Sequence, residues 1–460
     1  MNKYLYILGL VGTAFLSACS SDDLTTVLLP EEERTLVVEA GKDSDVPITL
    51  GVSSSRGLTR AVVNPDASGN FKTEEGKYLG VFCLATDIQS NIDESVIPEV
   101  IRTNNWNTAA EDDKAGLIVR MNNVPAKVTT DGTTSDVTFL DASTLTNPTP
   151  SVQHYYYPMD NWMKYNFYAY YPRQNETVEF VGLDRPTIEF SKVGTYYYLL
   201  EKYFEIDGTQ DIIWGKADPT EATAVYPAAN AAEPYSARYF RLKTEEVGAG
   251  SIVNFYPKLK FEQHKLVQFR FFVKAINSAV ANAVTINNIY IPNALGYLSL
   301  VIANQDREPV DSMKEGTIKV FGKKNVKKKL NIKWLTGANK DKDRFDKDGN
   351  GTLEDPINPI PTTLENYNDP IGYLMLASPT IGESRDPNFK YSLFLDFSSD
   401  RTSGFDSSGT LSVDLDTEGG FQEGKIYNIV VTIKSPVEIQ AKATLAGWVP
   451  VEDPVLLDAN

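Results

Sequence analysis

The sequence predicts an all-β protein. Apolar residues recur with period two in many short stretches, the spacing that puts alternate side chains on the buried face of a strand. Polar turns separate these stretches, and a helical period persists nowhere beyond a turn or two. Tyrosine occurs 24 times, and tyrosine favours pleated surfaces that are buried on one side. Strands without interleaved helices indicate antiparallel β-sandwiches with Greek-key connections.

Length and composition narrow the class of protein further. The 460 residues are enough for two or three domains, each with its own core. A hydrophobic content of 42% excludes a mainly disordered chain. The net charge of -17 argues against general binding to nucleic acid or to anionic lipid, both of which need an excess of Lys and Arg.

The amino terminus has the pattern of an export signal. Residues 1–18 combine a positive start with an apolar run and end in Leu-Ser-Ala before Cys19. Leu-Ser-Ala-Cys resembles a bacterial lipobox, in which the cysteine is lipidated after cleavage. Residues 20–23, Ser-Ser-Asp-Asp, resemble the acidic tag of surface-exposed lipoproteins. An ordinary signal peptide cleaved near Ala18 is the alternative.

A short strand and an arginine-bearing segment come next. Alternation from residue 46 to 52 predicts a half-buried strand whose apolar face carries Val46, Ile48, Leu50 and Val52. The residues that follow are small and polar and include Arg56 and Arg60. A protease can reach arginines in such a segment, so the pattern suggests a strand that is removed by cleavage.

Two series of strands follow. The first is expected at residues 78–86, 117–121, 137–140, 178–180, 187–190, 196–200, 212–215, 252–256 and 265–273. The second is expected at residues 317–321, 330–335, 372–377, 391–397, 411–415, 426–433 and 439–445. Residues 284–301 read as a hairpin that opens the second series, so a domain boundary is expected near residue 280.

An aromatic stretch lies within the first series. Residues 155–172 contain seven tyrosines and one tryptophan. The alternation of Phe167, Ala169 and Tyr171 with Tyr168 and Tyr170 favours a core strand. A stacking platform for sugars is the alternative.

Catalytic motifs are lacking, so the chain is predicted not to be an enzyme. It has only two histidines, His154 and His264, and neither has a second metal ligand at a suitable spacing. There is no Gly-x-Ser-x-Gly elbow and no phosphate-binding glycine loop. After Cys19, Cys83 is the only thiol, and its apolar neighbours indicate a small core residue.

Two charged segments are the remaining candidates for binding. An acidic loop has the front half of a calcium-binding loop, although Ile357 stands where the closing Glu is required. The candidate calcium ligands are Asp346, Asp348, Asn350, Thr352 and Asp355. A plain solvated turn is the alternative reading of this loop. Lysines between residues 323 and 329 indicate an exposed sheet edge, with a partner-binding patch as the alternative.

The carboxyl terminus is an extended apolar segment. After Trp448, one parity of the chain carries Val449, Val451, Val455 and Leu457. The pattern fits a last strand of the chain's own fold. It equally fits a strand that fills the groove of another subunit.

Several of these motifs together resemble the Bacteroidales fimbrillins, the type V pilins. The motifs are the lipobox Cys19, the arginine-bearing segment ending at Arg60, the segment 167–172, the strand after His264, and residues 425–430 followed by Gly447-Trp448. The resemblance implies two transthyretin-like Greek-key β-sandwich domains in tandem. It also implies a lipoprotein precursor in the outer membrane that is cleaved by an arginine-specific protease.

The resemblance assigns a role to each segment. Residues 1–18 would be the signal peptide, 19–60 a lipidated propeptide cut after Arg60 or, as second choice, Arg56. Residues 61–280 and 281–446 would be the two domains, and 447–460 a donor-strand tail. The expected role is a stalk subunit of a surface fimbrium that polymerises with its own copies and with tip and anchor subunits and supports adhesion. A tip adhesin and a surface glycan-binding lipoprotein are the alternatives.

Overall fold

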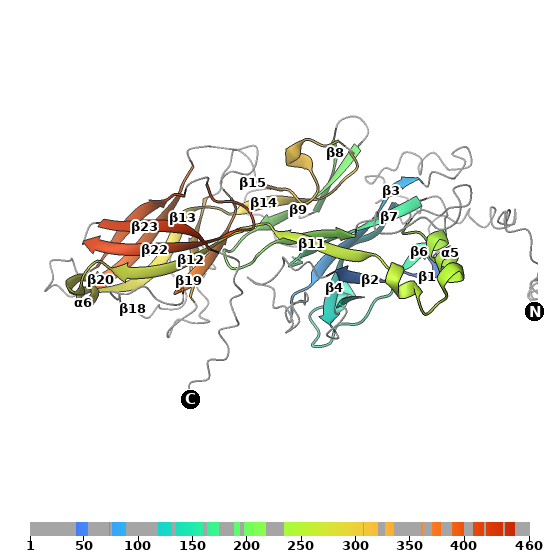
Figure 1. Ribbon diagram of the computed structural model, residues 1–460, viewed down its shortest axis with the longest axis horizontal. Helices are drawn as coiled ribbons and strands as arrows, with labels where there is room; N and C mark the ends of the chain where they lie inside the picture. The colour runs from blue at the N-terminus through green and yellow to red at the C-terminus, as the bar shows by residue number, and fades with distance from the viewer. Residues whose placement is uncertain are drawn as a thin grey trace, which may run out of the picture.

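The computed structural model describes much of the chain between residues 43 and 446. The described residues are 43–53, 73, 76–88, 118–130, 135–159, 163–173, 188–193, 197–217, 234–306, 308–320, 327–334, 360–361, 370–378, 389–399, 408–417, 420–435 and 438–446. Within them the fold is all-β, as the sequence predicts, and the molecule is elongated (Figure 1).

One end of the molecule is a closed barrel with the strand order β10-β11-β2-β5-β4-β3-β7. Its strands are β2 (Leu50–Ser53), β3 (Leu79–Ile88), β4 (Val119–Thr130), β5 (Ser135–Phe139), β7 (Met163–Tyr171), β10 (Ile213–Ala217) and β11 (Lys258–His264). A two-stranded ribbon of β1 (Asp43–Pro47) and β6 (Tyr156–Pro158) lies beside it. Closure matters because it leaves no free edge among the barrel strands.

The aromatic strand β7 is buried on both faces. Tyr165, Phe167 and Tyr171 point into the barrel, whereas Tyr168 and Tyr170 belong to the core outside it. The core-strand reading of this stretch is therefore confirmed, and these five rings are too buried to stack on a sugar.

The other end of the molecule is built from two five-stranded sheets (Figure 1). One has the order β17-β19-β12-β22-β23 and consists of β17 (Lys333–Trp334), β19 (Gly372–Leu376), β12 (Val267–Ala275), β22 (Ile426–Ser435) and β23 (Glu438–Ala446). The other has the order β16-β13-β20-β21, with β18 also paired to β13; its strands are β16 (Lys327–Asn331), β13 (Val284–Leu295), β20 (Tyr391–Ser399), β21 (Ser408–Leu415) and β18 (Ile360–Pro361). The lysine-bearing β16 is an end strand, as the blunted-edge reading predicts.

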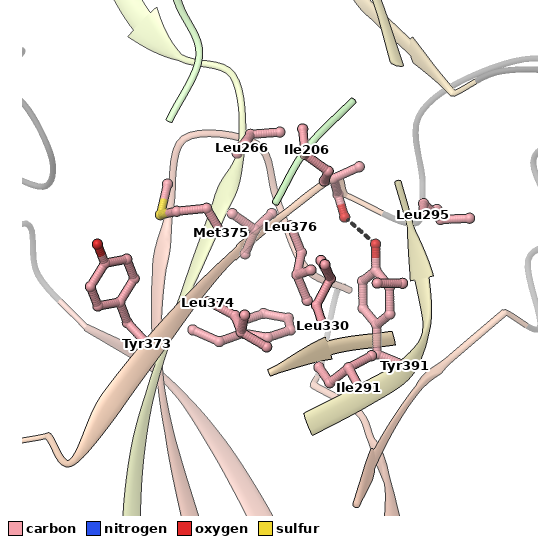
Figure 2. Packing of buried hydrophobic residues seen from close by; sticks show 14 of the residues in the cluster. Ile206, Leu266, Ile291, Leu295, Leu330, Tyr373, Leu374, Met375, Leu376 and Tyr391 are labelled. Atoms are coloured by element: carbon pink, nitrogen blue, oxygen red, sulfur yellow. Dashed lines mark hydrogen bonds between the residues drawn. The ribbon is translucent and has the colours of Figure 1, made fainter. Parts of the chain in front are cut away.

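The core between these sheets is tightly packed and apolar. Figure 2 shows Ile291 and Leu330 beside the ring of Tyr391, with Leu374 and Leu376 farther along the same packed core. The Tyr391 hydroxyl donates a hydrogen bond to the carbonyl oxygen of Ala377 (2.7 Å), which satisfies the one polar atom of that buried side chain.

A third sheet joins the two ends. It has the order β15-β14-β9-β8 and consists of β15 (Ile318–Val320), β14 (Tyr297–Asn304), β9 (Tyr197–Glu205) and β8 (Ile188–Val193). The predicted hairpin at residues 284–301 is wrong, because β13 pairs with β20 and β14 pairs with β9. The domain boundary expected near residue 280 stays a prediction. Two strands that precede residue 280 pair with strands that follow it: β12 pairs with β22, and β9 pairs with β14.

Some features differ from the sequence-based expectation. Two strand pairs are parallel, β2 with β11 and β12 with β22, because period-two alternation reports which face is buried but not strand direction. Residues expected as a strand at 252–256 form the 3-10 helix η6 (Ile252–Phe255). The helix α5 (Ala237–Val247) was not expected; further short helices are α6 (Ser278–Ala283), η4 (Ala142–Thr144) and η7 (Asp311–Met313).

Candidate functional site

The strand β2 is the candidate functional element, because it completes the barrel from the amino-terminal end of the described chain. It lies between two barrel strands, parallel to β11 and antiparallel to β5. Leu50 faces Val137 of β5, and Val52 is in register with Leu259 of β11. A strand with partners on both sides cannot leave without opening the barrel.

The predicted apolar face points into the barrel interior. Leu50 is 1% exposed and Val52 is 8% exposed, and Ile48 just before β2 is also buried. Val46 is half-buried and packs against the same core from the rim. Burying each such side chain contributes about 1.5–3 kcal/mol, so the segment stabilises the barrel substantially.

Backbone hydrogen bonds hold the segment along its length. The Ile48 amide donates to the carbonyl oxygen of Tyr155 (2.8 Å), and the Gly51 amide donates to that of Pro257 (2.9 Å). Upstream, β1 pairs antiparallel with β6, with Pro47 opposite Tyr156. The segment from 43 to 53 is thus held by β6, β5 and β11 in turn.

Two arginines bind the acidic start of the segment. Arg120 of β4 pairs with Asp43 and also donates from Nε to the carbonyl oxygen of Tyr156 (2.8 Å). Arg241 of α5 binds Asp45, with 2.7 Å between its terminal nitrogen and Asp45 Oδ1 and 3.3 Å between Nε and the same oxygen. Charge therefore fixes β1 on one face while β6 pairs with its backbone.

The helix α5 owes its position to a cap and an apolar face. Ser236 Oγ accepts a hydrogen bond from the Tyr239 amide (3.2 Å), which satisfies one of the free N–H groups at the helix start. Tyr239 and Phe240 are buried in the barrel core, so the helix is anchored and Arg241 faces β1.

A hollow of about 400 Å³ lies between β1 and α5. It is lined by Asp45, Val46, Pro47, Phe240, Arg241, Thr244, Glu245, Ile252 and Tyr256. The lining combines the charged side chains of Asp45, Arg241 and Glu245 with apolar and aromatic ones. Because three of its lining residues come from β1, the hollow would widen into a groove if that segment left.

The contact with Arg241 has a measurable pH signature. Hydrogen bonding from Arg241 lowers the pKa of the Asp45 carboxyl below its ordinary value. For a lowered pKa, the contribution to stability is complete above the unfolded pKa of about 3.9 and is lost as the pH falls through the folded pKa. We expect Arg241→Gln to raise the pKa of Asp45, as measured by NMR titration of its carboxyl carbon.

The same titration contains its control. Hydrogen bonds from Ser143 lower the pKa of Asp141, which is remote from α5 in the chain, and this pKa is expected to stay where it is in the Arg241→Gln protein. An unchanged pKa of Asp45 would show that the ion pair with Arg241 does not form in solution.

Many of the predicted site residues lie outside the described residues. These are Cys19, Arg56 and Arg60; Val449, Val451, Val455 and Leu457; and Asp346, Asp348, Asn350, Thr352 and Asp355. Their assigned roles stay predictions. Over the described ranges, no group of three His, Cys, Asp or Glu side chains could hold a metal ion, and no helix is long and apolar enough to cross a membrane.

The other singled-out residues have structural positions. Cys83 is fully buried in the barrel core, and burial raises the pKa of its thiol far above the usual range, so it stays a neutral core residue. His264 is buried where β11 ends, and its Nδ1 contacts Asp211. The structural reading of both residues is confirmed.

The sequence reasoning missed Arg120 and Arg241. Their partners Asp43 and Asp45 are 77 and 196 residues away along the chain, so no local spacing reveals the pairs. The available signals were the two acids Asp43 and Asp45 just before the predicted strand 46–52, and Ser236 as a helix cap before Ala237–Val247.

Comparison with known proteins finds similarity among solved structures. No family model matches the chain, and no curated protein matches it. A fimbrial protein from Bacteroides vulgatus is 15% identical, with a TM-score of 0.42, over 88% of this chain and 99% of that chain. A candidate cell adhesion protein from Bacteroides uniformis is 11% identical, with a TM-score of 0.39, over 88% and 99%.

A further similar structure is a fimbrial assembly protein from Parabacteroides distasonis, 9% identical with a TM-score of 0.29 over 88% of this chain and 99% of that chain. These structures carry the names expected from the sequence resemblance. The identities and TM-scores are low, so these similarities do not establish a role for this chain.

Proposed function

We propose that this chain is a structural subunit of a surface fimbrium that polymerises by strand exchange. The observation that carries the proposal is the place of β2: a strand inside the barrel, with Leu50 1% exposed, supplied by a segment that leads directly to Arg56 and Arg60. Cleavage after either arginine separates β1 and β2 from the rest of the chain.

Loss of the segment would create a defined binding site. The edges of β5 and β11 would both lose backbone partners, and the barrel interior would open where Ile48, Leu50 and Val52 had been. Unpaired strand edges beside an apolar groove favour the addition of a new strand. The segment is thus a placeholder that keeps the subunit from polymerising before cleavage.

The carboxyl-terminal segment is the proposed replacement. Val451, Val455 and Leu457 share one parity, as Ile48, Leu50 and Val52 do. The groove and the tail are different surfaces of the subunit, so each contact is head-to-tail and the assembly grows as an open filament. This arrangement favours a stalk subunit, with a tip adhesin as the rival role.

Export and maturation complete the proposal. Cys19 would be lipidated and hold the precursor at the outer membrane until an arginine-specific protease at the cell surface cuts the chain. A fimbrial and adhesive role needs neither catalysis nor a metal, in keeping with the absence of catalytic motifs in the sequence. Calcium at residues 346–355 remains a separate proposal.

Deletion of residues 447–460 tests the proposed role. A stalk subunit without its donor strand is expected to accept one strand and offer none, so surface fimbriae should shorten. Mixed with uncleaved precursor, which has a tail but a filled groove, the protease-treated deletion protein should form nothing larger than dimers. Fimbriae of full length from a strain carrying only the deletion would contradict the stalk role and favour the tip role.

A further inference from the structure

The tail matches the placeholder segment in residue character at five of eight aligned positions. Residues 45–52 read Asp-Val-Pro-Ile-Thr-Leu-Gly-Val, and residues 452–459 read Glu-Asp-Pro-Val-Leu-Leu-Asp-Ala. An acid stands first, proline third, a β-branched residue fourth, leucine sixth and a small apolar residue eighth in both.

We propose that the tail of a second copy binds in the same chain direction as β1 and β2, with residue 452 at the place of residue 45. Arg241 then binds Glu452 and Lys258 binds Asp458, and these two contacts set the register of the subunits. The inference rests on the proposed strand exchange and names its partner surface.

Arg241 provides the contact at the first end of the site. Its terminal nitrogen already binds a carboxylate at position 45 at 2.7 Å, and its side chain is 41% exposed with that partner in place. Glutamate is one methylene longer than aspartate and carries the same charge. Departure of Asp45 on cleavage leaves Arg241 available for Glu452.

Residues 454–457 of the tail can make the same backbone and apolar contacts that residues 47–50 of the placeholder make. Proline at position 47 has no N–H to donate, so Pro454 can replace it without losing a hydrogen bond. The Val455 amide can replace the Ile48 amide that donates to Tyr155, and Leu457 matches Leu50 in size.

Lys258 provides the contact at the second end. It is exposed and in parallel register with Gly51. A Cβ added at Gly51 would lie 3.5 Å from Lys258 Cγ and 3.6 Å from the Ser135 carbonyl oxygen, which is ordinary van der Waals contact. A side chain therefore fits at this position, and Asp458 would lie beside the lysine. Asp136 of β5 is paired with the same position and would repel the Asp458 carboxylate. The attraction of Asp458 to Lys258 must therefore exceed its repulsion by Asp136.

Asp453 excludes the neighbouring registers. It has the same parity as Val455 and Leu457, so it points toward the barrel wherever those two side chains do. A shift by two residues puts its carboxylate at the position of Ser44 or Ile48, both of which are buried, at a high desolvation cost. At the position of Val46 it lies on the rim, beside the hollow and Arg241.

A zero-length cross-link between amine and carboxylate tests the register directly. Full-length precursor, half of it isotopically labelled, is cleaved with an arginine-specific protease, allowed to polymerise and treated with a carbodiimide. Mass spectrometry of the ladder is expected to find Lys258 of one copy joined to Asp458 of another, and Asp458→Asn should remove that product. Lys258 joined to Glu452 would show the reverse direction and overturn the inference.

Charge reversal gives an independent readout. We expect Arg241→Glu and Glu452→Lys each to slow polymer formation on the order of fivefold, and the double variant to restore it, because a partly exposed ion pair is replaced by repulsion and then by the inverted pair. Lys390→Glu is the matched control, since Lys390 pairs with Asp416 on the other end of the molecule.

The outcomes separate this inference from the proposed function. If wild-type protein forms no ladder after cleavage, strand exchange fails and the register fails with it. If wild-type protein polymerises while both single reversals leave its rate unchanged, only the register is overturned. Arg241→Glu should also destabilise the uncleaved precursor, where Asp45 is the partner, and Glu452→Lys should not correct that defect.

Discussion

Replacing both Arg56 and Arg60 with lysine is expected to abolish fimbrial polymers while the precursor folds normally. Lysine keeps the charge of the segment but removes the side chain that an arginine-specific protease recognises. The placeholder then stays in the barrel, and no groove opens for the tail of another copy. Heat-sensitive ladders on gels, present for the wild type after protease treatment, should lose at least nine-tenths of their intensity, on the order of tenfold, because the uncleaved precursor has no open groove.

Arg34→Lys is the matched control for this pair of substitutions. Arg34 precedes the strand, so a cut there would leave Val46 to Val52 attached to the barrel. The control protein should form ladders like the wild type. Ladders of undiminished intensity from the Arg56→Lys/Arg60→Lys protein would contradict release of the strand by arginine cleavage.

Leu50→Ala is expected to destabilise the precursor and leave the polymer unchanged. Leu50 is 1% exposed in the barrel interior, and truncation of such a leucine lowers the free energy of unfolding by about 2–5 kcal/mol. After cleavage the residue is no longer part of the subunit. Urea unfolding of the precursor and of the cleaved, polymerised protein measures both effects.

Leu259→Ala separates this result from a general core defect. Leu259 is fully buried on β11, in register with Val52, and it remains in the subunit after cleavage. It should lower the stability of precursor and polymer alike. Equal destabilisation of the polymer by Leu50→Ala would mean that β2 is retained in the assembled subunit.

The sequence predicts most of the strands because burial alternates along them. In β12 and β22, buried and half-buried residues alternate, and the period-two pattern places both strands closely. In β7 the last five residues are all buried, yet the aromatic content still identifies a strand. The fold class follows from such local patterns.

The pairing partner of each strand is not encoded in the local sequence of that strand. The parallel pairing of β2 with β11 joins residues about two hundred positions apart, and neither strand alone shows its direction or partner. The turn between β13 and β14 looks like a hairpin because Gly296 and an asparagine occur there, but each strand continues into a different sheet.

The sequence predicts only part of the candidate site, because it shows the burial of a strand but not contacts between distant residues. The apolar face of the first strand is visible as alternation, and three of its four residues prove buried. The arginines that hold its acidic end are not visible, because they are single residues on β4 and on the unexpected helix α5. Ion pairs across the fold leave no periodic trace in the sequence.

The position of Gly51 distinguishes the placeholder from the tail that is proposed to replace it. In the placeholder this position offers Lys258 no carboxylate, whereas the matching residue of the tail is Asp458. The placeholder fills the interior with Ile48 and Val52, where the tail has the smaller Val455 and Ala459. The placeholder therefore relies more on apolar packing, and the tail relies more on its contact with Lys258. Cleavage decides which of the two strands occupies the barrel.

Intact-mass analysis of the protein taken from the cell surface tests the central claim most directly. The account predicts that assembled copies begin at Ala61, or at Gly57 if Arg56 is cut, and lack Cys19 and the strand from Val46 to Val52. Assembled copies that all retain a lipidated Cys19 and the complete segment through Arg60 would contradict it.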